Sequence, residues 1–340
     1  MIIEGSKFHY PKAPIVLESG RELHGVQIAY HTFGQLNERK DNVIWIIHAL
    51  TANSNPMDWW PGMVGENAVI NPGEHYIVCA NVLGSPYGST CPTDINPLSG
   101  QAYYRDFPML TIRDLIKPYE SLAEDLGIEK IKMLIGASMG GQQAMEWAIK
   151  HPERIEKLAL LATNANHSPW GIAFNESQRM AIEADQSWLK NYPDAGAKGL
   201  MAARSIALLS YRTVSGYNYT QSESESKIDD FKASSYQKYQ GEKLAKRFNA
   251  FSYYIFTKAM DSHDVGRGRK SREEALGRIK AKTTIIGIES DILFPLFEQE
   301  FLHAHIPNSK MFAIQSKFGH DGFLVEKDVV GQIVLDALSD

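Results

Sequence analysis

A short glycine-rich segment at residues 136–141, GASMGG, constrains the fold more than any other part of the sequence. The largely apolar run 132–135 before it is typical of a buried strand, and residues 142–149 after it have helical spacing. The small residues on either side of Ser138 permit a sharp turn from strand to helix with the serine at its apex. Because such a turn exposes the hydroxyl and points the helix N-terminus at it, we predict that Ser138 is a nucleophile.

A serine nucleophile needs a base and an acid that orients the base, and both are expected later in a chain with this turn. Residues 283–288 have the composition of a buried parallel strand, and Asp291 follows them closely. A further strand is expected at 310–314, and His320 comes after it, just before the last helix. We therefore predict that His320 is the base and that Asp291 orients it.

Three other residues compete for these two roles. His303 and His305 lie in, or at the end of, the helix expected before residue 310, and both are expected at the surface. Glu289 precedes Asp291 by two positions, so its side chain is expected to fall short of the imidazole.

Acyl transfer also requires two N–H donors that stabilise the oxyanion of the tetrahedral intermediate. The first is expected from the backbone of Met139, the residue after the nucleophile. The second is expected from the loop 48–53, which follows a predicted strand at 42–47, with Leu50 or a neighbour as the donor.

The 340-residue length and the hydrophobic content of 44% suit one large α/β domain with an insertion. No apolar run reaches about 18 residues and no charged-then-apolar leader opens the sequence, so a cytoplasmic protein without a membrane span is expected. Cys79 lies in a predicted strand and Cys91 in a loop, so both are expected to be free thiols.

Charge and motifs argue against several classes of function. The formal net charge is −5 and no basic stretch is long enough to bind a nucleic-acid backbone, so nucleic acid is not an expected partner. The phosphate-binding loop, the dinucleotide fingerprint and the zinc-hydrolase motif are all absent from the sequence. The predicted serine chemistry requires no metal, and we expect neither a metal site nor a bound cofactor.

The alternation of predicted strands and helices indicates an α/β fold with a mostly parallel central sheet and helices on both faces. This alternation covers residues 1–165 and returns at 280–340, which we assign to one core. Residues 166–279 contain helical segments but no convincing strand, so a helical lid is expected there. In addition to the segments above, core strands are expected at 26–33, 43–48, 76–82, 131–136 and 156–162, with a helix at 111–126.

Within the lid, helices are expected at 176–184, 199–209 and 241–260. Residues 219–226 are polar, and a mobile loop is expected there. A basic cluster at 267–272 could attract phosphate groups, although a solvated face is the favoured interpretation of such a run.

Taken together, these segments resemble the homoserine O-acetyltransferase family of the α/β-hydrolase superfamily. The similarity covers nearly the whole chain, lid included. Its motifs lie at 48–51, 81–84, 87–90, 106–108, 111–114, 136–147, 172–175, 199–204, 290–294 and 319–325. The family commonly has glycine where this chain has Ala52, Cys91 and Ala137, and none of these departures removes a catalytic group. Cys91 could still alter the surroundings of the oxyanion hole.

The resemblance implies an α/β-hydrolase fold and an enzyme that moves an acetyl group from acetyl-CoA to the hydroxyl of L-homoserine through an acyl-enzyme on Ser138, in methionine biosynthesis. Acetyl-CoA is then a co-substrate, and a homodimer assembled through the lid is implied as well. Arg204 is implied to bind the substrate carboxylate and Asp321 its ammonium group. Taken alone, Arg204 would be a surface charge and Asp321 a helix N-cap, and Arg212 is an alternative carboxylate ligand.

Other functions stay open on the same scaffold. Succinyl-CoA could replace acetyl-CoA as donor, or serine could replace homoserine as acceptor, because motifs near the serine do not set pocket volume. A plain serine esterase is a second class, and a binding protein without activity is a third. Asn175 and Arg179 could line the tunnel, but a role in holding the lid together is favoured.

Overall fold

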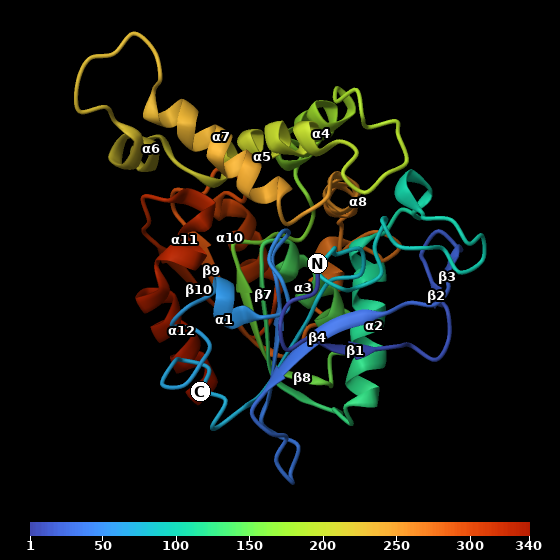
Figure 1. Cartoon of the computed structure of the whole chain (residues 1–340). Helices are drawn as coiled ribbons and strands as arrows, with labels where there is room; N and C mark the ends of the chain where they lie inside the picture. Colours follow the sequence, from blue (N-terminus) through green and yellow to red (C-terminus); the bar gives the residue numbers. More distant parts are fainter.

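The computed structural model describes residues 1–340 and is built around an eight-stranded sheet with the strand order β1-β4-β6-β5-β7-β8-β9-β10 (Figure 1). Strand β4 runs antiparallel to both of its neighbours, and all other pairs in this sheet are parallel. The strands are β1 (Lys7–His9), β4 (Ile28–Phe33), β5 (Val43–Ile47), β6 (Tyr76–Ala80), β7 (Ile131–Ala137), β8 (Ile155–Leu161), β9 (Lys282–Ile288) and β10 (Ser309–Ile314). The predicted fold class is confirmed.

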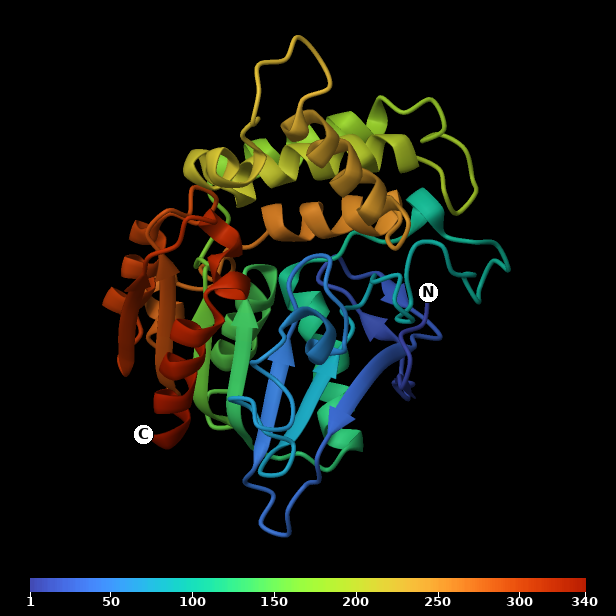
Figure 2. The ribbon, with the colours of Figure 1, turned by 60° about the vertical axis from the view of Figure 1, so that its left-hand side comes forward.

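Both faces of the sheet are covered. Successive residues of each central strand point to opposite sides, and in this sheet both sets of side chains are apolar and buried. In β5, Trp45 and Ile47 belong to one apolar cluster and Ile44 and Ile46 to another. The first cluster includes side chains of α2 (Ile112–Asp125), α3 (Met139–Lys150) and α10 (Leu296–His305), and the second includes those of α12 (Lys327–Ser339). Figure 2 shows α12 in front of the sheet and α2 behind it.

The core strands predicted from the sequence are all present, with ends that differ by no more than two residues. Three short strands were not predicted, namely β1 and the hairpin of β2 (Ile15–Val16) and β3 (Glu22–Leu23). Runs of two or three residues are too short to show an alternating pattern, so only their pairing partners define them.

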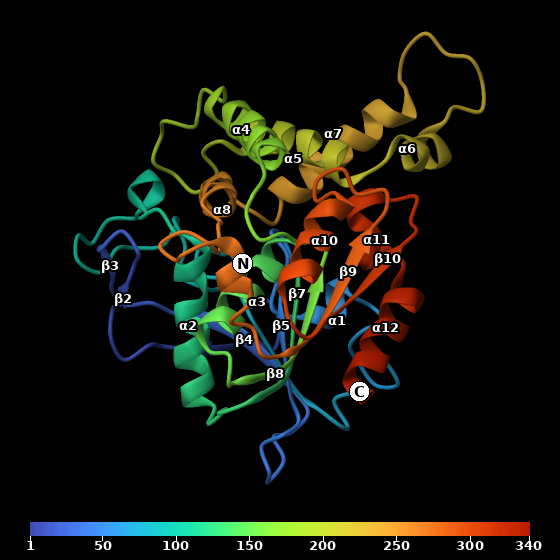
Figure 3. The same cartoon turned by 180° about the vertical axis from the view of Figure 1, so that it is seen from behind.

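Five helices form a layer above the carboxyl ends of the strands (Figures 1 and 3). They are α4 (Pro169–Glu183), α5 (Ala197–Tyr211), α6 (Val214–Gln221), α7 (Lys232–Ala245) and α8 (Ala250–Asp261). The short helices α1 (Pro56–Trp59), α9 (Arg272–Leu276) and α11 (Gly322–Val325) complete the structure. None of the helices is both long and apolar enough to cross a membrane.

Two predictions within this layer are wrong. The single helix expected at 241–260 is two helices, because the side chain of Asn249 accepts the Ser252 N–H at 2.7 Å and begins α8 as an N-cap. Residues 219–221, expected in a loop, end helix α6, whose first turn is capped by Thr213.

Asn175 and Arg179 hold two lid helices together, which is the role that the sequence analysis favoured for them. The Arg179 guanidinium lies 2.6 Å from the Asp261 carboxylate, and Asn175 Nδ2 donates to the same carboxylate at 2.8 Å. These contacts join α4 to α8. Arg179 is only 2% exposed and also contacts Glu176 within α4, so its buried guanidinium is paired with a carboxylate of each helix.

The C-terminal boundary of the lid, expected at residue 279, lies earlier in the chain if the segment after α8 is assigned by its contacts, because these contacts are with the core. Arg113 in α2 donates to the Asp264 carbonyl at 3.2 Å, and Arg269 pairs with the buried Glu146 of α3 at 2.7 Å. We propose that the lid spans residues 166 to about 263 and that the segment to 279 belongs with the core.

Helix α3 approaches the sheet so closely that its first turn tolerates no side chain at Gly140. A Cβ added there would lie 2.2 Å from the Ile47 carbonyl oxygen of β5. Gly140→Ala is therefore expected to destabilise the protein by about 1–3 kcal/mol, because neither backbone can move without displacing Ser138. Denaturant unfolding measures this loss. Gly277→Ala, where the nearest atom is 3.3 Å away, is the control, and an equal effect of both variants would contradict the prediction.

Candidate active site

Ser138 occupies the turn between β7 and α3 in a backbone conformation that few residues adopt. Its φ is 55° and its ψ −124°, in the region where non-glycine residues are strained. The surrounding structure holds it there, because its N–H donates to the Leu161 carbonyl at 2.9 Å and its carbonyl accepts from Thr163 Oγ1 at 2.9 Å. Strain of this kind is typical of a nucleophile held for reaction.

The structure brings the three predicted triad residues together. Ser138 Oγ lies 3.0 Å from His320 Nε2, and His320 Nδ1 lies 2.6 Å from Asp291 Oδ2. The other Asp291 oxygen accepts the N–H groups of Leu293 and Phe294 at 2.8 and 2.9 Å, which fixes the carboxylate. Since Nδ1–H donates to the carboxylate, Nε2 is free to accept the serine proton.

His320 is enclosed by aromatic rings. Phe294 stacks on the imidazole at a centroid distance of 5.0 Å, and Tyr211 and Phe323 each lie 5.6 Å away. Burial lowers the pKa of His320, but the charge and hydrogen bond of Asp291, with the charge of Asp321, outweigh it and raise the pKa above the ordinary value. The site thus stabilises the imidazolium that forms when the base takes a proton, relative to an imidazole in water.

The competing residues lie elsewhere. Glu289 is exposed and makes no contact with the imidazole. His303 pairs with Ser309 at 2.9 Å, and His305 hydrogen-bonds to the Phe301 carbonyl within α10. The preference for Asp291 and His320 over these residues agrees with the geometry.

Two backbone N–H groups near Ser138 are free for an oxyanion. Met139 is the first residue of α3, so its N–H has no partner in the helical pattern. Leu50 lines the same cavity as Ser138, and its N–H donates to no acceptor in the protein. Their role as an oxyanion hole stays a prediction, which this placement supports.

A buried histidine that sequence reasoning missed holds the loop containing Leu50. His48 is fully buried; its Nδ1–H donates to the Ala49 carbonyl at 2.8 Å, and its Nε2 accepts the Val82 N–H at 3.2 Å. Burial lowers its pKa to about 4, so the ring is neutral at neutral pH. The signals in the sequence were its position directly after the central strand and its place in the family motif at 48–51.

A buried polar layer behind the elbow was also missed. Gln142 Nε2 donates to Asn164 Oδ1 and Asn164 Nδ2 donates to Glu298, both at 3.0 Å, and Gln299 Nε2 donates to the Thr163 carbonyl at 2.7 Å. Burial raises the pKa of Glu298 to about 7. These bonds connect α3, the end of β8 and α10 beneath Ser138.

Ser138 and His320 open into a cavity of about 420 Å³ between the core and the lid. Arg204 of α5 lines it, half-buried and without a carboxylate partner, with its guanidinium 5.5 Å from the Tyr211 ring centroid. Asp321 lines it as well. Both residues thus share one cavity with Ser138 and His320.

Asp321 occupies the N-cap position of α11 that the sequence suggests, but its side chain is engaged elsewhere. It makes no capping hydrogen bond and lies 2.8 Å from Arg212 Nε, whose guanidinium also lies 5.5 Å from the Phe318 ring centroid. Arg212 does not line the cavity. This pairing makes Arg212 a weaker candidate for the substrate carboxylate than Arg204.

The basic cluster at 267–272 is largely neutralised by the core. Arg267 pairs with Glu18, Arg269 with Glu146 and Arg272 with Asp264, at 2.9, 2.7 and 2.9 Å. The favoured interpretation of a surface face therefore fits better than a phosphate site.

Neither cysteine belongs to the Ser138 cavity. Cys79 and Cys91 are buried and unpaired with each other, and burial raises the pKa of the Cys91 thiol to about 11. The possibility that Cys91 alters the oxyanion hole is thus not supported. The structure contains no group of three or more His, Cys, Asp or Glu side chains placed to bind a metal ion.

Comparisons with known proteins agree with this geometry. The family model of the alpha/beta hydrolase fold matches residues 42–327, which places the chain in that class of enzymes. A homoserine O-acetyltransferase from Cyclobacterium marinum is 50% identical over 325 residues, covering 96% of this chain and 93% of the relative. One from Chlorobaculum tepidum is 42% identical, covering 99% and 95%. The chain belongs to the homoserine O-acetyltransferase family.

Solved structures show the same fold over the full length. The homoserine O-acetyltransferase from Bacillus anthracis superimposes with a TM-score of 0.89 at 25% identity, covering 100% of this chain and 98% of its own. Esterase E22 superimposes with a TM-score of 0.88 at 24% identity, covering 98% and 99%. The second likeness concerns the fold alone, and it shows that this architecture also occurs in an esterase.

Proposed function

We propose that this enzyme transfers an acetyl group from acetyl-CoA to the hydroxyl of L-homoserine through an acyl-enzyme on Ser138. The observation that carries the proposal is the connected array of Ser138, His320 and Asp291 at a cavity that also presents the unpaired Arg204. The full-length identity of 50% to a homoserine O-acetyltransferase supports the same reaction. The product, O-acetyl-L-homoserine, belongs to methionine biosynthesis.

In the first half-reaction, Ser138 Oγ attacks the thioester carbonyl while His320 Nε2 takes its proton. The carbonyl oxygen becomes an oxyanion that the N–H groups of Leu50 and Met139 stabilise. When the intermediate collapses, the C–S bond breaks and the departing sulfur of coenzyme A takes the proton from His320. The acetyl group then remains as an ester on Ser138.

In the second half-reaction, the homoserine hydroxyl gives its proton to His320 and attacks the ester carbonyl. The same oxyanion donors act again. The bond from the acetyl carbon to Ser138 Oγ breaks, and His320 returns the proton to the serine. Homoserine must compete with water for the acetyl group. The helical layer over the carboxyl ends of the strands (Figure 2) covers the cavity of Ser138, and such a cover favours homoserine by limiting the access of water.

Arg204 and Asp321 are the proposed ligands of homoserine. The Arg204 guanidinium has no carboxylate partner in the protein, so it can bind the substrate carboxylate. The Asp321 carboxylate can accept from the substrate ammonium, and its contact with Arg212 holds it in place without blocking all of its acceptor positions.

Arg204→Ala is expected to raise the KM for L-homoserine by about tenfold or more, because a charged hydrogen bond to the carboxylate is lost. Acetylation of Ser138 by acetyl-CoA should change much less. Steady-state kinetics with varied homoserine and a pre-steady-state measurement of thiol release separate the two. If the homoserine kinetics are unchanged, the role of binding the substrate carboxylate passes to Arg212. Arg212→Ala is the comparison variant.

Release of free thiol tests the proposed function against its alternatives. Acetyl-CoA and succinyl-CoA are each supplied with L-homoserine, with L-serine or without acceptor. Sustained release that requires homoserine and prefers acetyl-CoA supports the proposal, whereas a preference for succinyl-CoA or serine assigns the other transferase. Equal release without any acceptor indicates a serine esterase, a class whose members include proteins of the same fold, such as esterase E22.

We also propose a homodimer assembled through the lid. Its support is the set of large apolar side chains that the lid exposes, among them Trp170, Met180, Leu209 and Val214. Phe251 and Tyr253 are buried within the chain and contribute nothing to such a surface. Light scattering on the purified protein measures the mass, and a monomer at micromolar concentration contradicts this assembly. The cytoplasmic location stays a prediction from the sequence.

A further inference from the structure

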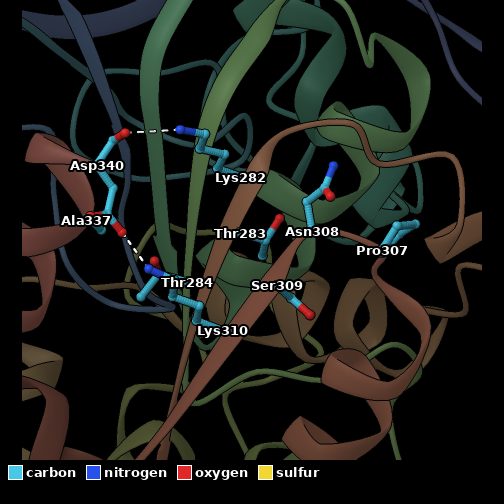
Figure 4. Close-up of a pocket in the computed structure, with 9 residues that line it drawn as sticks. All are labelled: Lys282, Thr283, Thr284, Pro307, Asn308, Ser309, Lys310, Ala337 and Asp340. Carbon is cyan, nitrogen blue, oxygen red and sulfur yellow. Dashed lines mark hydrogen bonds and ion pairs between the residues drawn. The ribbon is translucent and has the colours of Figure 1, made fainter.

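The proposed donor carries phosphate groups, so a cationic site for them is expected along the path from Ser138 to solvent. Two groups of basic side chains elsewhere in the protein are already engaged. In the cluster at 267–272 the three arginines are paired with carboxylates, and the exposed Lys270 does not line the Ser138 cavity. A second cavity, of about 480 Å³, lies at the amino ends of β9 and β10, and there Lys282 and Lys310 bind Asp340 (Figure 4). Neither group of cations is free for a ligand of the active site.

In addition to Arg204, two cationic side chains line the cavity that contains Ser138. Lys243 lies in the last turn of α7, and Arg247 lies just beyond the end of that helix. Lys243 is exposed and Arg247 is half-buried, and neither pairs with a carboxylate. Of the carboxylates in this cavity, Asp321 is held by Arg212, which leaves Asp58 at the rim.

Arg247 is fixed in place yet keeps part of its donor set unused. Its Nη1 donates to the Thr51 carbonyl at 2.6 Å and to the Tyr87 hydroxyl. Its Nε and Nη2 have no acceptor in the protein, and they are not among the buried polar atoms without partners, so they are accessible. A pre-positioned guanidinium with free N–H groups suits an anionic oxygen ligand.

We propose that Lys243 and Arg247 form the binding site for the phosphate groups of the thioester donor. This assignment rests on the proposed function, because it takes the donor to be a coenzyme A thioester. The exposed Lys243 marks the outer end of the donor path, and Ser138 marks its inner end. Arg247 also contacts the loop that presents Leu50, through Thr51, so the donor site adjoins the oxyanion hole.

Calorimetric binding of coenzyme A, compared with pantetheine, tests the site without requiring turnover. Pantetheine has the same thiol arm but no phosphates. Lys243→Ala is expected to raise the Kd of coenzyme A by about tenfold, and Arg247→Lys to weaken it through loss of the planar donor set. Lys238→Ala, an exposed lysine on the same helix that lines no described cavity, is the matched control and should bind coenzyme A as the wild type does.

The two ligands together decide the outcome. A loss of affinity that Lys243→Ala causes for coenzyme A but not for pantetheine, and that becomes smaller as salt is added, supports the phosphate site. Equal weakening of coenzyme A and pantetheine by Lys243→Ala, or no weakening of either, overturns it. If the wild type binds coenzyme A through these cations but transfers no acetyl group to homoserine, the proposed function fails and the site stands. If transfer proceeds and Lys243→Ala leaves coenzyme A binding unchanged, the site fails and the function stands.

Discussion

Ser138→Ala is expected to lower the rate of acetyl transfer by about five to six orders of magnitude, as removal of a triad serine does in other enzymes. Without Oγ there is no atom to carry the acetyl group, and His320 has no proton to take from the protein. Thiol release from acetyl-CoA in the presence of L-homoserine measures the loss.

The fold should survive this change, which makes the result interpretable. The contacts that hold residue 138 in its strained conformation are made by its backbone N–H and carbonyl with Leu161, Gly141 and Thr163. A melting temperature close to that of the wild type is therefore expected. Residual transfer above about one per cent in a folded variant would contradict a covalent route through Ser138.

Asp291→Asn is expected to lower the turnover number by about four orders of magnitude, the effect seen when a triad carboxylate becomes an amide. The amide would offer N–H groups to His320 Nδ1, which now lies 2.6 Å from a carboxylate oxygen. The proton of the neutral imidazole then moves to Nε2, and Nε2 can no longer accept from Ser138.

The charge of Asp291 matters as well as its geometry. Burial by itself lowers the pKa of His320, and the Asp291 carboxylate reverses that effect, so the variant histidine should have a pKa below the wild-type value. Glu289→Gln, two residues away and exposed, is the control that should keep full activity. A loss below tenfold in Asp291→Asn would remove the residue from the triad, and an equal loss in Glu289→Gln would point to the wrong carboxylate.

The core and the triad could be predicted because their signals are local. Each predicted strand is a short apolar run, and Ser138, Asp291 and His320 each follow such a run at the carboxyl edge of a parallel sheet. Parallel strands bring their carboxyl ends to one edge, so residues 182 positions apart meet there without any further information.

The remaining features depend on contacts between distant segments. The ion pair of Arg212 with Asp321 joins the lid to the loop after β10, and the sequence alone suggested a helix cap for Asp321 instead. His48 is held by a backbone N–H from another loop, at Val82. The break between α7 and α8 is different, since Asn249 is a recognisable N-cap that the continuous helical pattern of 241–260 obscured.

The triad alone does not determine whether the enzyme is a transferase or an esterase, because both reactions use it. Esterase E22 has the same fold over 99% of its chain, so the fold alone does not distinguish the two reactions. In this protein the proposed acceptor ligands are Arg204 on α5 and Asp321 beside the histidine, both in the cavity of Ser138. They are charged groups that an esterase of neutral substrates does not need.

Mass spectrometry of the enzyme after brief mixing with acetyl-CoA tests the central claim most directly. Without acceptor, we expect one acetyl group per chain on the peptide that contains Ser138, and its rapid loss, with formation of O-acetyl-L-homoserine, when L-homoserine is added. Acetyl-CoA turnover with homoserine but no acetylated Ser138 would contradict the acyl-enzyme route. Loss of the acetyl group to water as fast as to homoserine would contradict the transferase.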